Sequence, residues 1–587
     1  MKQFLITVAG VLVGLLLFAG LTPFILLGVV AAAARPTPTP ARTVLLIDLR
    51  GALTDQASRN PFALLSGRTQ SVMGIEQTLR QAENDERVRG VFVRLPETGM
   101  APAAADELRE AFKAFHRHGK FVIAHSQGLY AAGAIASTYE LAASAGELWM
   151  QPGSAFQVTG MANEDLFFKR AFDRFGVVAD FQQRYEYKNA VNPYLYDDYT
   201  PAHRTAELGW MTSVYASALQ AAAADRSKPF DMIKTTLEAG PYSAEEAKSK
   251  GLVDRIGLPQ EAEAAALAQA GDGAKLVDIA DYKGNGFADR TGPKIAVISA
   301  EGAIMTGPSG GASPLGGESA IRSDEVAKAF YRAIDDSQVR AIVFRLSSPG
   351  GSDSASEQIL AAVRAARAAG KPVVVSMGVY GASGGYWVSS DANAIVAEPT
   401  TLTGSIGVFG GKLVIGPALA KFGVDMRGLS VGGPFASSGA GGQPMSAQQH
   451  AVFSNWMDRI YNGFIGRVAE GRHLPVDKVA AIARGRVWTG AQAAGLGLVD
   501  QLGGFYDAVD RAKALAHIQG DARLVAFDGG TTLEALQRLF GGQTLLARIG
   551  GGAYVADDVE ARALVGALGD ARLRAKGAMV LAPMPRF

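Results

Sequence analysis

Short apolar runs recur along this chain, and most of them show little alternation between apolar and polar residues. Such runs occupy residues 44–52, 88–95, 295–303 and 339–346. A strand without polar alternation is typical of a sheet that is buried on both faces. Helical stretches separate the runs, as at residues 104–118 and 356–369. The pattern therefore predicts α/β layers around a largely parallel sheet.

The second half of the chain repeats the order of segments in the first half. Residues 44–52 are echoed by 295–303, residues 88–95 by 339–346, residues 126–133 by 376–383, and residues 242–254 by 488–500. Matches in one order at a nearly constant shift indicate a duplication. We expect two tandem domains of one fold, at residues 44–280 and 294–528, with a linker at 281–293. A tail at residues 529–587 is expected to be helical or partly disordered.

The N-terminus carries a long uncharged segment. No residue between Lys2 and Arg35 is charged, and the run exceeds the roughly 20 apolar residues that span a bilayer. We interpret residues 1–35 as a transmembrane helix, and a signal peptide cleaved near Ala34 is the alternative. Residues 36–43 then form a stiff, proline-rich linker to the body of the protein.

Length and composition narrow the class of protein. A chain of 587 residues is too long for one core, which agrees with two domains. The 57 basic and 56 acidic residues nearly cancel, so nothing indicates a nucleic-acid partner. The absence of cysteine excludes disulfide bonds and thiolate zinc sites.

A candidate nucleophile lies where an apolar run gives way to a glycine-rich turn. Residues 372–375 are followed by the turn that contains Ser383, flanked by Ala382 and Gly384. A serine between small residues at a strand end is held clear of its neighbours, and backbone N–H groups can point to the space beside it. Further loops with glycine and hydroxyl groups lie at residues 347–352 and 402–407. A tight turn without chemistry is the alternative.

The two copies differ at the positions that such chemistry requires. Gly133 stands in the first half where the second half has Ser383. Conversely, the first half carries Lys188 between aromatic residues, whereas the second half has no lysine in the stretch between Val424 and Lys478. Each half thus keeps one candidate group, although a lysine of this kind is more often simply solvated.

These segments resemble the signal peptide peptidase A family in its long, duplicated form, which is peptidase family S49 of the Clp-protease/crotonase superfamily. The resemblance covers residues 1–528, and its most specific motifs lie at residues 187–190, 347–352, 382–387 and 402–407. Asn189 and Gly381 depart from the residues common in the family. The resemblance implies two Clp/crotonase-like repeats after the transmembrane helix. It also implies a homotetramer in the bacterial inner membrane, with a single span and the bulk of the chain on the periplasmic side.

The resemblance further implies a serine endopeptidase that degrades remnant signal peptides and other extended apolar peptides. Its Ser/Lys dyad would be Ser383 as nucleophile and Lys188 as general base and acid, with the backbone N–H groups of Gly351 and Gly384 as oxyanion hole. The expected partners are peptide substrates and the membrane, and neither a metal nor an organic cofactor is implied.

A lysine can act as a base only when it is neutral. Its pKa must therefore fall from about 10.4 by roughly three units. Burial between repeats or between subunits lowers the pKa because it disfavours the ammonium form. Tyr185 and Tyr187 are candidate walls, and we expect assembly to be needed for activity. Whether Lys188 serves Ser383 of its own chain or of a neighbour is left open.

Two other functions stay open. The turn around Ser383 also fits the G-x-S-x-G motif of an α/β-hydrolase, an esterase that would require an acid and then His450, His473 or His517. That hypothesis leaves the duplication unexplained. A catalytically inactive membrane scaffold of the same fold is the second alternative. Retention of one dyad residue in each half argues against it.

Overall fold

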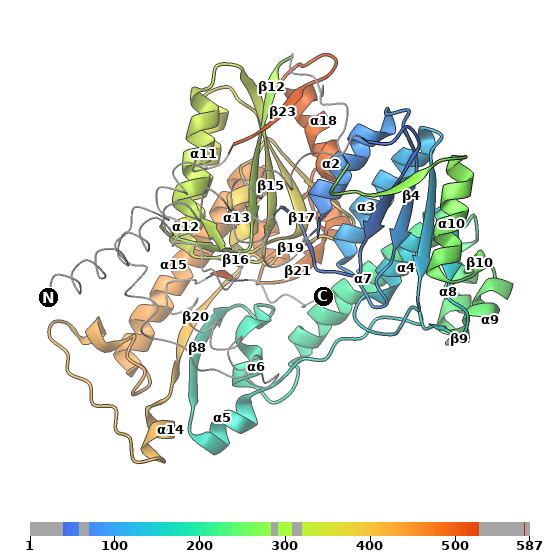
Figure 1. Cartoon of the computed structure of the whole chain (residues 1–587). Helices are drawn as coiled ribbons and strands as arrows, with labels where there is room; N and C mark the ends of the chain where they lie inside the picture. The colour runs from blue at the N-terminus through green and yellow to red at the C-terminus, as the bar shows by residue number, and fades with distance from the viewer. Residues whose placement is uncertain (1–38, 58–69, 283–291, 308–319, 528–579, 582–587) are drawn as a thin grey trace, which may run out of the picture.

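Two parallel sheets with helices packed on their faces lie side by side, as a computed structural model of the chain shows (Figure 1). The structure describes residues 39–57, 70–282, 292–307, 320–527 and 580–581. The predicted α/β class is confirmed. The expected transmembrane helix at residues 1–35 and nearly all of the tail lie outside the described residues, as does most of the linker. Within the described ranges, no helix combines the length and apolar character needed to cross a bilayer.

The first sheet has the strand order β10-β6-β5-β4-β1-β11, and all its strand pairs are parallel. Its strands are β1 (Thr43–Asp48), β4 (Val88–Arg94), β5 (Phe121–Ser126), β6 (Glu147–Met150), β10 (Arg255–Ile256) and β11 (Lys275–Asp278). The helices of this half are α2 (Val72–Glu83), α3 (Pro102–Arg117), α4 (Ile135–Ala143), α7 (Pro201–Asp225), α8 (Phe230–Glu238), α9 (Ala244–Ser249) and α10 (Pro259–Ala270). Apolar side chains of β4 and β5 are buried, as strands covered on both faces require.

The second sheet repeats this order as β22-β18-β17-β15-β12-β23, again with parallel pairs. Its strands are β12 (Lys294–Glu301), β15 (Val339–Ser348), β17 (Val373–Ala382), β18 (Ala394–Ala397), β22 (Gln501–Leu502) and β23 (Arg523–Ala526). The end of β17 also pairs with β19 (Leu402–Gly404), which is antiparallel to β21 (Val487–Thr489). Corresponding segments of the duplicated sequence thus form corresponding strands.

Helices cover the second sheet in the same manner. They are α11 (Ser323–Asp335), α12 (Asp353–Ala368), α13 (Gly384–Ser389), α15 (Ala447–Arg472), α16 (Val476–Ile482), α17 (Gly490–Leu496) and α18 (Phe505–Leu515). The helical patterns at residues 104–118 and 356–369 correspond to α3 and α12. Helix α12 begins earlier than expected because the Ser352 side chain caps it by accepting a hydrogen bond from the Ala355 N–H.

An arm projects from the two sheets at the lower left of Figure 1 and is built from both halves. Its centre is an antiparallel pair of β8 (Val178–Arg184) from the first half and β20 (Val408–Val414) from the second. The other elements of the arm are α5 (Lys169–Phe175), η2 (Asn189–Val191), α6 (Asn192–Leu195), α14 (Gly416–Ala420) and η3 (Pro434–Ser437). This antiparallel pair, which we call the arm ribbon, therefore brings β8 of the first half against β20 of the second half.

Short strands complete the fold. They are β2 (Leu53–Thr54) with β3 (Gln70–Ser71), β7 (Ala155–Phe156) with β9 (Tyr242–Ser243), and the group β13 (Ala303–Met305), β14 (Ala320–Arg322), β16 (Gly350–Gly351) and β24 (Val580–Leu581). In the last group, β24 pairs antiparallel with β16. A segment near the end of the chain therefore lies beside the glycine loop of the second half.

A buried ion cluster joins the two halves. The Arg345 side chain on β15 is fully buried, and its guanidinium donates to Asp55 at 3.0 Å and to Glu107 at 2.6 Å, both from the first half. It also donates to the Ser376 hydroxyl at 3.0 Å. A Cβ at Gly378 would come within 2.4 Å of Asp55, so glycine is needed where the halves approach.

Candidate active site

Ser383 follows the last residue of β17 and precedes the first residue of α13. Its backbone has φ 55° and ψ −117°, a conformation that a non-glycine residue rarely adopts. A Cβ at Gly384 would meet the Ser356 hydroxyl at 2.7 Å, and one at Gly385 would meet the Ser348 carbonyl at 2.7 Å. Small residues around Ser383 are therefore required by close packing. Strain held in place by packing is typical of functional residues.

Lys188 lies beside Ser383, although the two residues come from different halves. Strand β8 ends at Arg184, and the loop of residues 185–188 then turns toward the second sheet. The Lys188 side chain is fully buried, and its Nζ lies 2.8 Å from Ser383 Oγ. The two residues that remained after comparison of the duplicated halves are thus in hydrogen-bond contact within one chain.

Ser405 is the second neighbour of Lys188. The lysine Nζ donates to the Ser405 carbonyl at 2.9 Å and contacts its hydroxyl at 3.0 Å. Ser405 has φ 49°, and this unusual backbone brings both oxygens to the amine. Ser405 belongs to the motif at residues 402–407, for which the sequence indicates no individual role. The backbone carbonyl, which every residue has, carries no sequence signal.

Burial lowers the pKa of Lys188 well below its ordinary value. The cause is desolvation, since its hydrogen-bond partners are the hydroxyls and carbonyl of the two serines. A lysine of this kind can be neutral near neutral pH and can accept the proton of the nearby serine hydroxyl. The enclosure is present within one chain, so desolvation of Lys188 needs no neighbouring copy.

The two tyrosines that were expected to enclose the amine lie on the outer side of its loop. Tyr185 is 41% exposed and packs edge-on against Tyr461. Tyr187 lies beneath the guanidinium of Arg486 at 5.2 Å. Gly485, which the sequence did not single out, packs closely on Lys188, since a Cβ there would come within 2.6 Å of the Lys188 nitrogen.

Gly351 and Gly384 lie next to each other beside Ser383. A Cβ built on Gly384 would come within 2.9 Å of the Gly351 nitrogen. Gly351 itself packs against the backbone of Ile304, where a Cβ would come within 2.0 Å of the carbonyl oxygen. Ser348 fixes the turn before it, since its hydroxyl donates to Gly302 O and accepts from Gly350 N. Glycine backbones from two loops thus meet at the candidate nucleophile.

The histidines of the α/β-hydrolase alternative have other surroundings. His450 contacts Asp180 at 3.0 Å and Gln182 at 3.0 Å on the arm. His473 lies at the C-terminal end of α15, and His517 lies just after α18. Among the described residues, the side chain in hydrogen-bond contact with Ser383 Oγ is Lys188.

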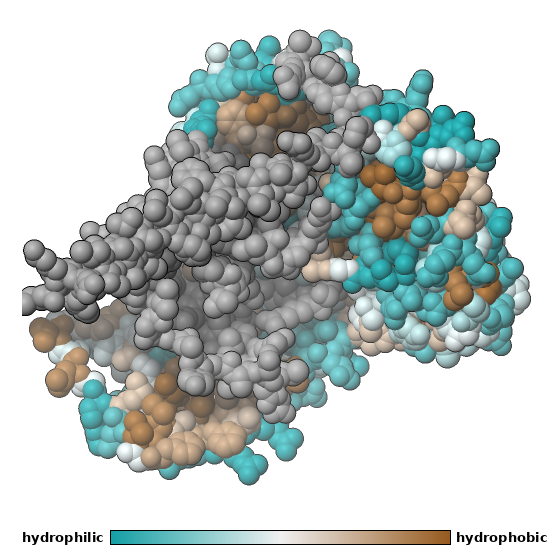
Figure 2. Space-filling view, viewed as in Figure 1, coloured by the Kyte–Doolittle hydropathy of each residue, from teal (hydrophilic) through white to brown (hydrophobic). Residues whose placement is uncertain are grey.

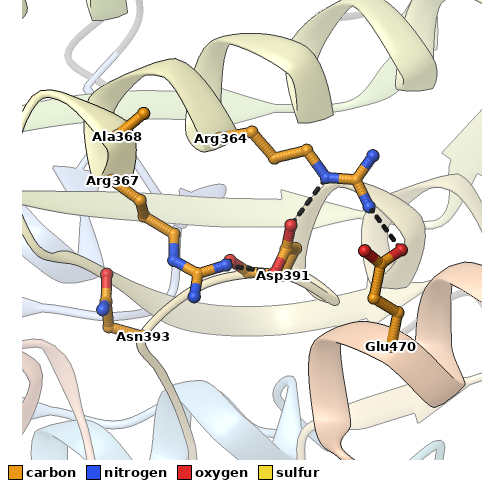
Figure 3. A pocket seen from close by; sticks show the side chains of 6 residues that line it. All are labelled: Arg364, Arg367, Ala368, Asp391, Asn393 and Glu470. Carbon is orange, nitrogen blue, oxygen red and sulfur yellow. Dashed lines mark hydrogen bonds and ion pairs between the residues drawn. The ribbon is translucent and has the colours of Figure 1, made fainter.

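A surface cavity of about 530 Å³ lies at the opposite end of β17 (Figure 3). Asn393 on its wall accepts a hydrogen bond from Val373 N, the first residue of that strand. The cavity's arginines are already paired, Arg364 with Asp391 and Glu470, and Arg367 with Asp391. It is therefore separate from the Ser383 region and offers no unpaired charge to a ligand.

Comparison with known proteins places relatives over both halves. The model of "Peptidase family S49" matches residues 114–272 and 365–519. The chain is 35% identical to "Protease 4" of Salmonella typhi over 504 residues, which cover 82% of this chain and 79% of that protein. It is 30% identical to "Protease 4" of Haemophilus influenzae over 523 residues, covering 84% and 82%. It is 28% identical to "Serine protease SPPA, chloroplastic" of Arabidopsis thaliana over 491 residues, covering 81% and 69%.

Proposed function

Because this chain belongs to peptidase family S49 and is a serine protease, we propose that it cleaves extended apolar peptides with Ser383 as nucleophile and Lys188 as general base. The observation that carries the proposal is the distance of 2.8 Å between Lys188 Nζ and Ser383 Oγ. The lowered pKa of Lys188 supports the role of a base, because a buried amine loses its proton more readily.

The reaction follows from this geometry. Neutral Lys188 takes the proton of the Ser383 hydroxyl while Oγ attacks the carbonyl carbon of the peptide bond. The N–H groups of Gly351 and Gly384 stabilise the resulting oxyanion, where one such donor typically contributes about 3 kcal/mol. The Lys188 ammonium then protonates the leaving amine, and an acyl-enzyme forms. Lys188 then takes a proton from water, whose oxygen attacks the ester carbonyl. The Lys188 ammonium returns the proton to Ser383 Oγ as the ester bond breaks, which frees the serine and the acid product.

The substrate class is supported by the edge of β16. This two-residue strand contains Gly351, and β24 of the same chain pairs with it in antiparallel direction. The edge therefore accepts an extended backbone through main-chain hydrogen bonds, a mode that reads little sequence. Remnant signal peptides are extended, apolar substrates of this kind. We propose them as the physiological substrate class on the basis of the family resemblance.

We also propose that residues 1–35 anchor the protein in the bacterial inner membrane, with the body on the periplasmic side. The uncharged run between Lys2 and Arg35 supports the anchor, and the orientation rests on the family resemblance. N-terminal sequencing of membrane-extracted protein tests the anchor, and a mature start near Arg35 contradicts it. Protease added to spheroplasts should digest the body, and full protection contradicts the orientation.

Exposed apolar side chains on the arm support assembly into a homo-oligomer, a tetramer by the family resemblance. Phe422 is 77% exposed, and Leu429 and Val431 are almost completely exposed. Figure 2 shows hydrophobic surface at the lower left of the molecule, where the arm lies. Apolar groups gathered in this way usually mark an interface. Light scattering of the purified protein tests the proposal, and a monomer at micromolar concentration contradicts it.

Substitution of the two proposed catalytic residues tests the proposed reaction. Ser383→Ala and Lys188→Ala should each abolish hydrolysis of a short apolar peptide while the variants stay folded. Lys188→Arg should not restore activity, because guanidinium does not lose its proton at neutral pH. Wild-type activity should rise with pH as Lys188 deprotonates, with an apparent pKa well below 10.5. Wild-type activity in either folded alanine variant refutes the Ser/Lys assignment.

A further inference from the structure

The loop that carries Lys188 is held by a turn of the second half. This turn, residues 484–486 between α16 and β21, we call the clasp. A Cβ at Gly485 would come within 2.6 Å of the Lys188 nitrogen and Cβ, and within 2.7 Å of its Cα. These atoms are mostly backbone, so they cannot move aside as the end of a flexible side chain can. Any side chain at position 485 must therefore displace Lys188.

Backbone hydrogen bonds fix the clasp on both sides. The Arg484 carbonyl accepts hydrogen bonds from the Tyr185 and Tyr187 N–H groups at 3.3 Å. Gly485 N donates to Ile406 O at 2.8 Å, and Ser405 N donates to Arg486 O at 2.8 Å. The clasp thus lies between the lysine loop and the Ser405 segment and is hydrogen-bonded to both.

Close backbone packing continues behind the clasp. A Cβ at Gly407 would come within 2.7 Å of Arg184 O and 2.8 Å of Gly485 Cα. Glycines at positions 407 and 485 therefore allow three backbone segments to stack at distances that side chains would prevent. On the outer side, the Arg484 guanidinium binds both carboxylate oxygens of Glu186 at 2.8 and 2.9 Å.

We propose that Gly485 is a positioning residue for Lys188: its lack of a side chain lets the clasp press the lysine loop against Ser383 and keep the amine out of water. This inference rests on the proposed function of the same site. Charged and titratable groups around the loop are Glu186 on the loop itself, Arg484 and Arg486 on the clasp, Arg184 of β8 paired with Asp458 of α15, and Tyr461 of α15. Glu186 is paired with Arg484, so exclusion of water governs the state of the amine.

The test is the pH profile of Gly485→Ala, measured as kcat and KM for a short apolar peptide. Displacement of Lys188 should lower kcat by roughly 100-fold at neutral pH and leave KM nearly unchanged. Water that reaches the amine should raise the apparent pKa of the kcat/KM profile by about one unit or more. Gly520→Ala is the matched control, since Gly520 has a similar positive φ of 74° and a Cβ there meets nothing within 4 Å. It should behave as wild type.

The outcomes separate this inference from the proposed function. If Ser383→Ala or Lys188→Ala retains wild-type hydrolysis, the Ser/Lys assignment itself fails. If both are inactive but Gly485→Ala keeps the wild-type kcat and pH profile, only the positioning role fails. A merely structural role would lower the amount of active protein without shifting the apparent pKa.

A second variant keeps the inference testable if Gly485→Ala does not fold. Glu186→Gln adds no side-chain bulk at the clasp and removes the ion pair with which Arg484 holds the outer side of the clasp to the lysine loop. Loss of a negative charge near Lys188 would by itself lower the pKa of the amine. A loosened clasp admits water and raises it. A rise in the apparent pKa of the kcat/KM profile supports the clasp, and a fall or no change overturns it.

Discussion

Lys188 is a buried amine whose hydrogen-bond partners carry no negative charge. Its partners are the Ser383 hydroxyl and the hydroxyl and carbonyl of Ser405. Burial lowers the pKa of Lys188, so the folded protein releases a proton that the unfolded chain keeps. This residue therefore makes folding less favourable at neutral pH, while it provides the neutral amine that the proposed reaction requires.

The stability of the protein should depend on pH through this residue. Between the lowered folded pKa and about 10.5, the unfolded state binds more protons, so the free energy of unfolding rises with pH by up to about 1.4 kcal/mol per pH unit. In Lys188→Met this pH-dependent contribution to the free energy of unfolding is absent, because methionine does not titrate. Urea denaturation of both proteins at pH 7 and pH 9 should therefore show that the free energy of unfolding of the wild type rises relative to that of the variant as the pH rises. An equal difference at both pH values contradicts a depressed lysine pKa.

The two side chains that meet in the candidate site, Ser383 and Lys188, could be singled out from the sequence. Comparison of the halves identified both residues. The first half has Gly133 where the second half has Ser383, and the second half has no lysine in the stretch that corresponds to Lys188. Ser405 and Gly485 could not be found in this way. Besides its hydroxyl, Ser405 contributes a carbonyl through a backbone with positive φ, and Gly485 contributes the absence of a Cβ. Neither property can be read from residue type without the neighbouring backbone.

At the scale of elements, the buried strands were predictable and the arm was not. Strands such as β15 and β17 are continuous apolar runs, which only a covered sheet explains. Strand β8 contains Asp180, Gln182 and Gln183. It pairs with β20, where Val178 lies opposite Val414 and Arg184 lies opposite Val408, 236 and 224 positions later. A polar ribbon between distant segments has no local signal.

The arm ribbon should be needed for activity because β8 leads directly into the lysine loop. A Cβ at Gly411 of β20 would come within 2.2 Å of the Asp180 carbonyl, and its φ of 142° disfavours other residues. Gly411→Ala should therefore separate β20 from β8 and shift the lysine loop. We expect kcat to fall at least about tenfold and the free energy of unfolding to fall by about 1–3 kcal/mol. Peptide hydrolysis and thermal unfolding measure the two effects.

Gly428→Ala is the control for the ribbon, because a Cβ there meets nothing within 4 Å. It should retain wild-type kinetics. Full activity of Gly411→Ala would show that the ribbon does not set the position of Lys188.

At the scale of the whole molecule, the duplication was evident from the sequence, but the ion cluster that joins the halves was not. Arg345 lies in an apolar run and gave no sign of its partners. In the structure it binds Asp55 and Glu107 across the boundary. Burial disfavours its charge, yet the two carboxylates raise the pKa of Arg345 well above its ordinary value. Long-range pairing of this kind depends on how two folded units dock.

Removal of this arginine should be strongly destabilising. Arg345→Met leaves two buried carboxylates without their cation, which typically costs about 3–5 kcal/mol. Urea denaturation measures the loss. The triple variant Arg345→Met, Asp55→Asn and Glu107→Gln should recover most of it, because no buried charge is left unpaired. If the single and triple variants are equally unstable, shape rather than charge holds the halves together.

The contact between Lys188 and Ser383 spans 195 positions of one chain, and this has a consequence for mixtures of intact and altered copies. Each copy carries its own complete pair, so activity in a mixed population should follow the fraction of intact chains in direct proportion. Co-expressed Ser383→Ala and Lys188→Ala chains should not rescue each other, and an inactive allele should act as recessive. The recessive behaviour of such an allele would show, in living cells, that Lys188 and Ser383 pair within one chain.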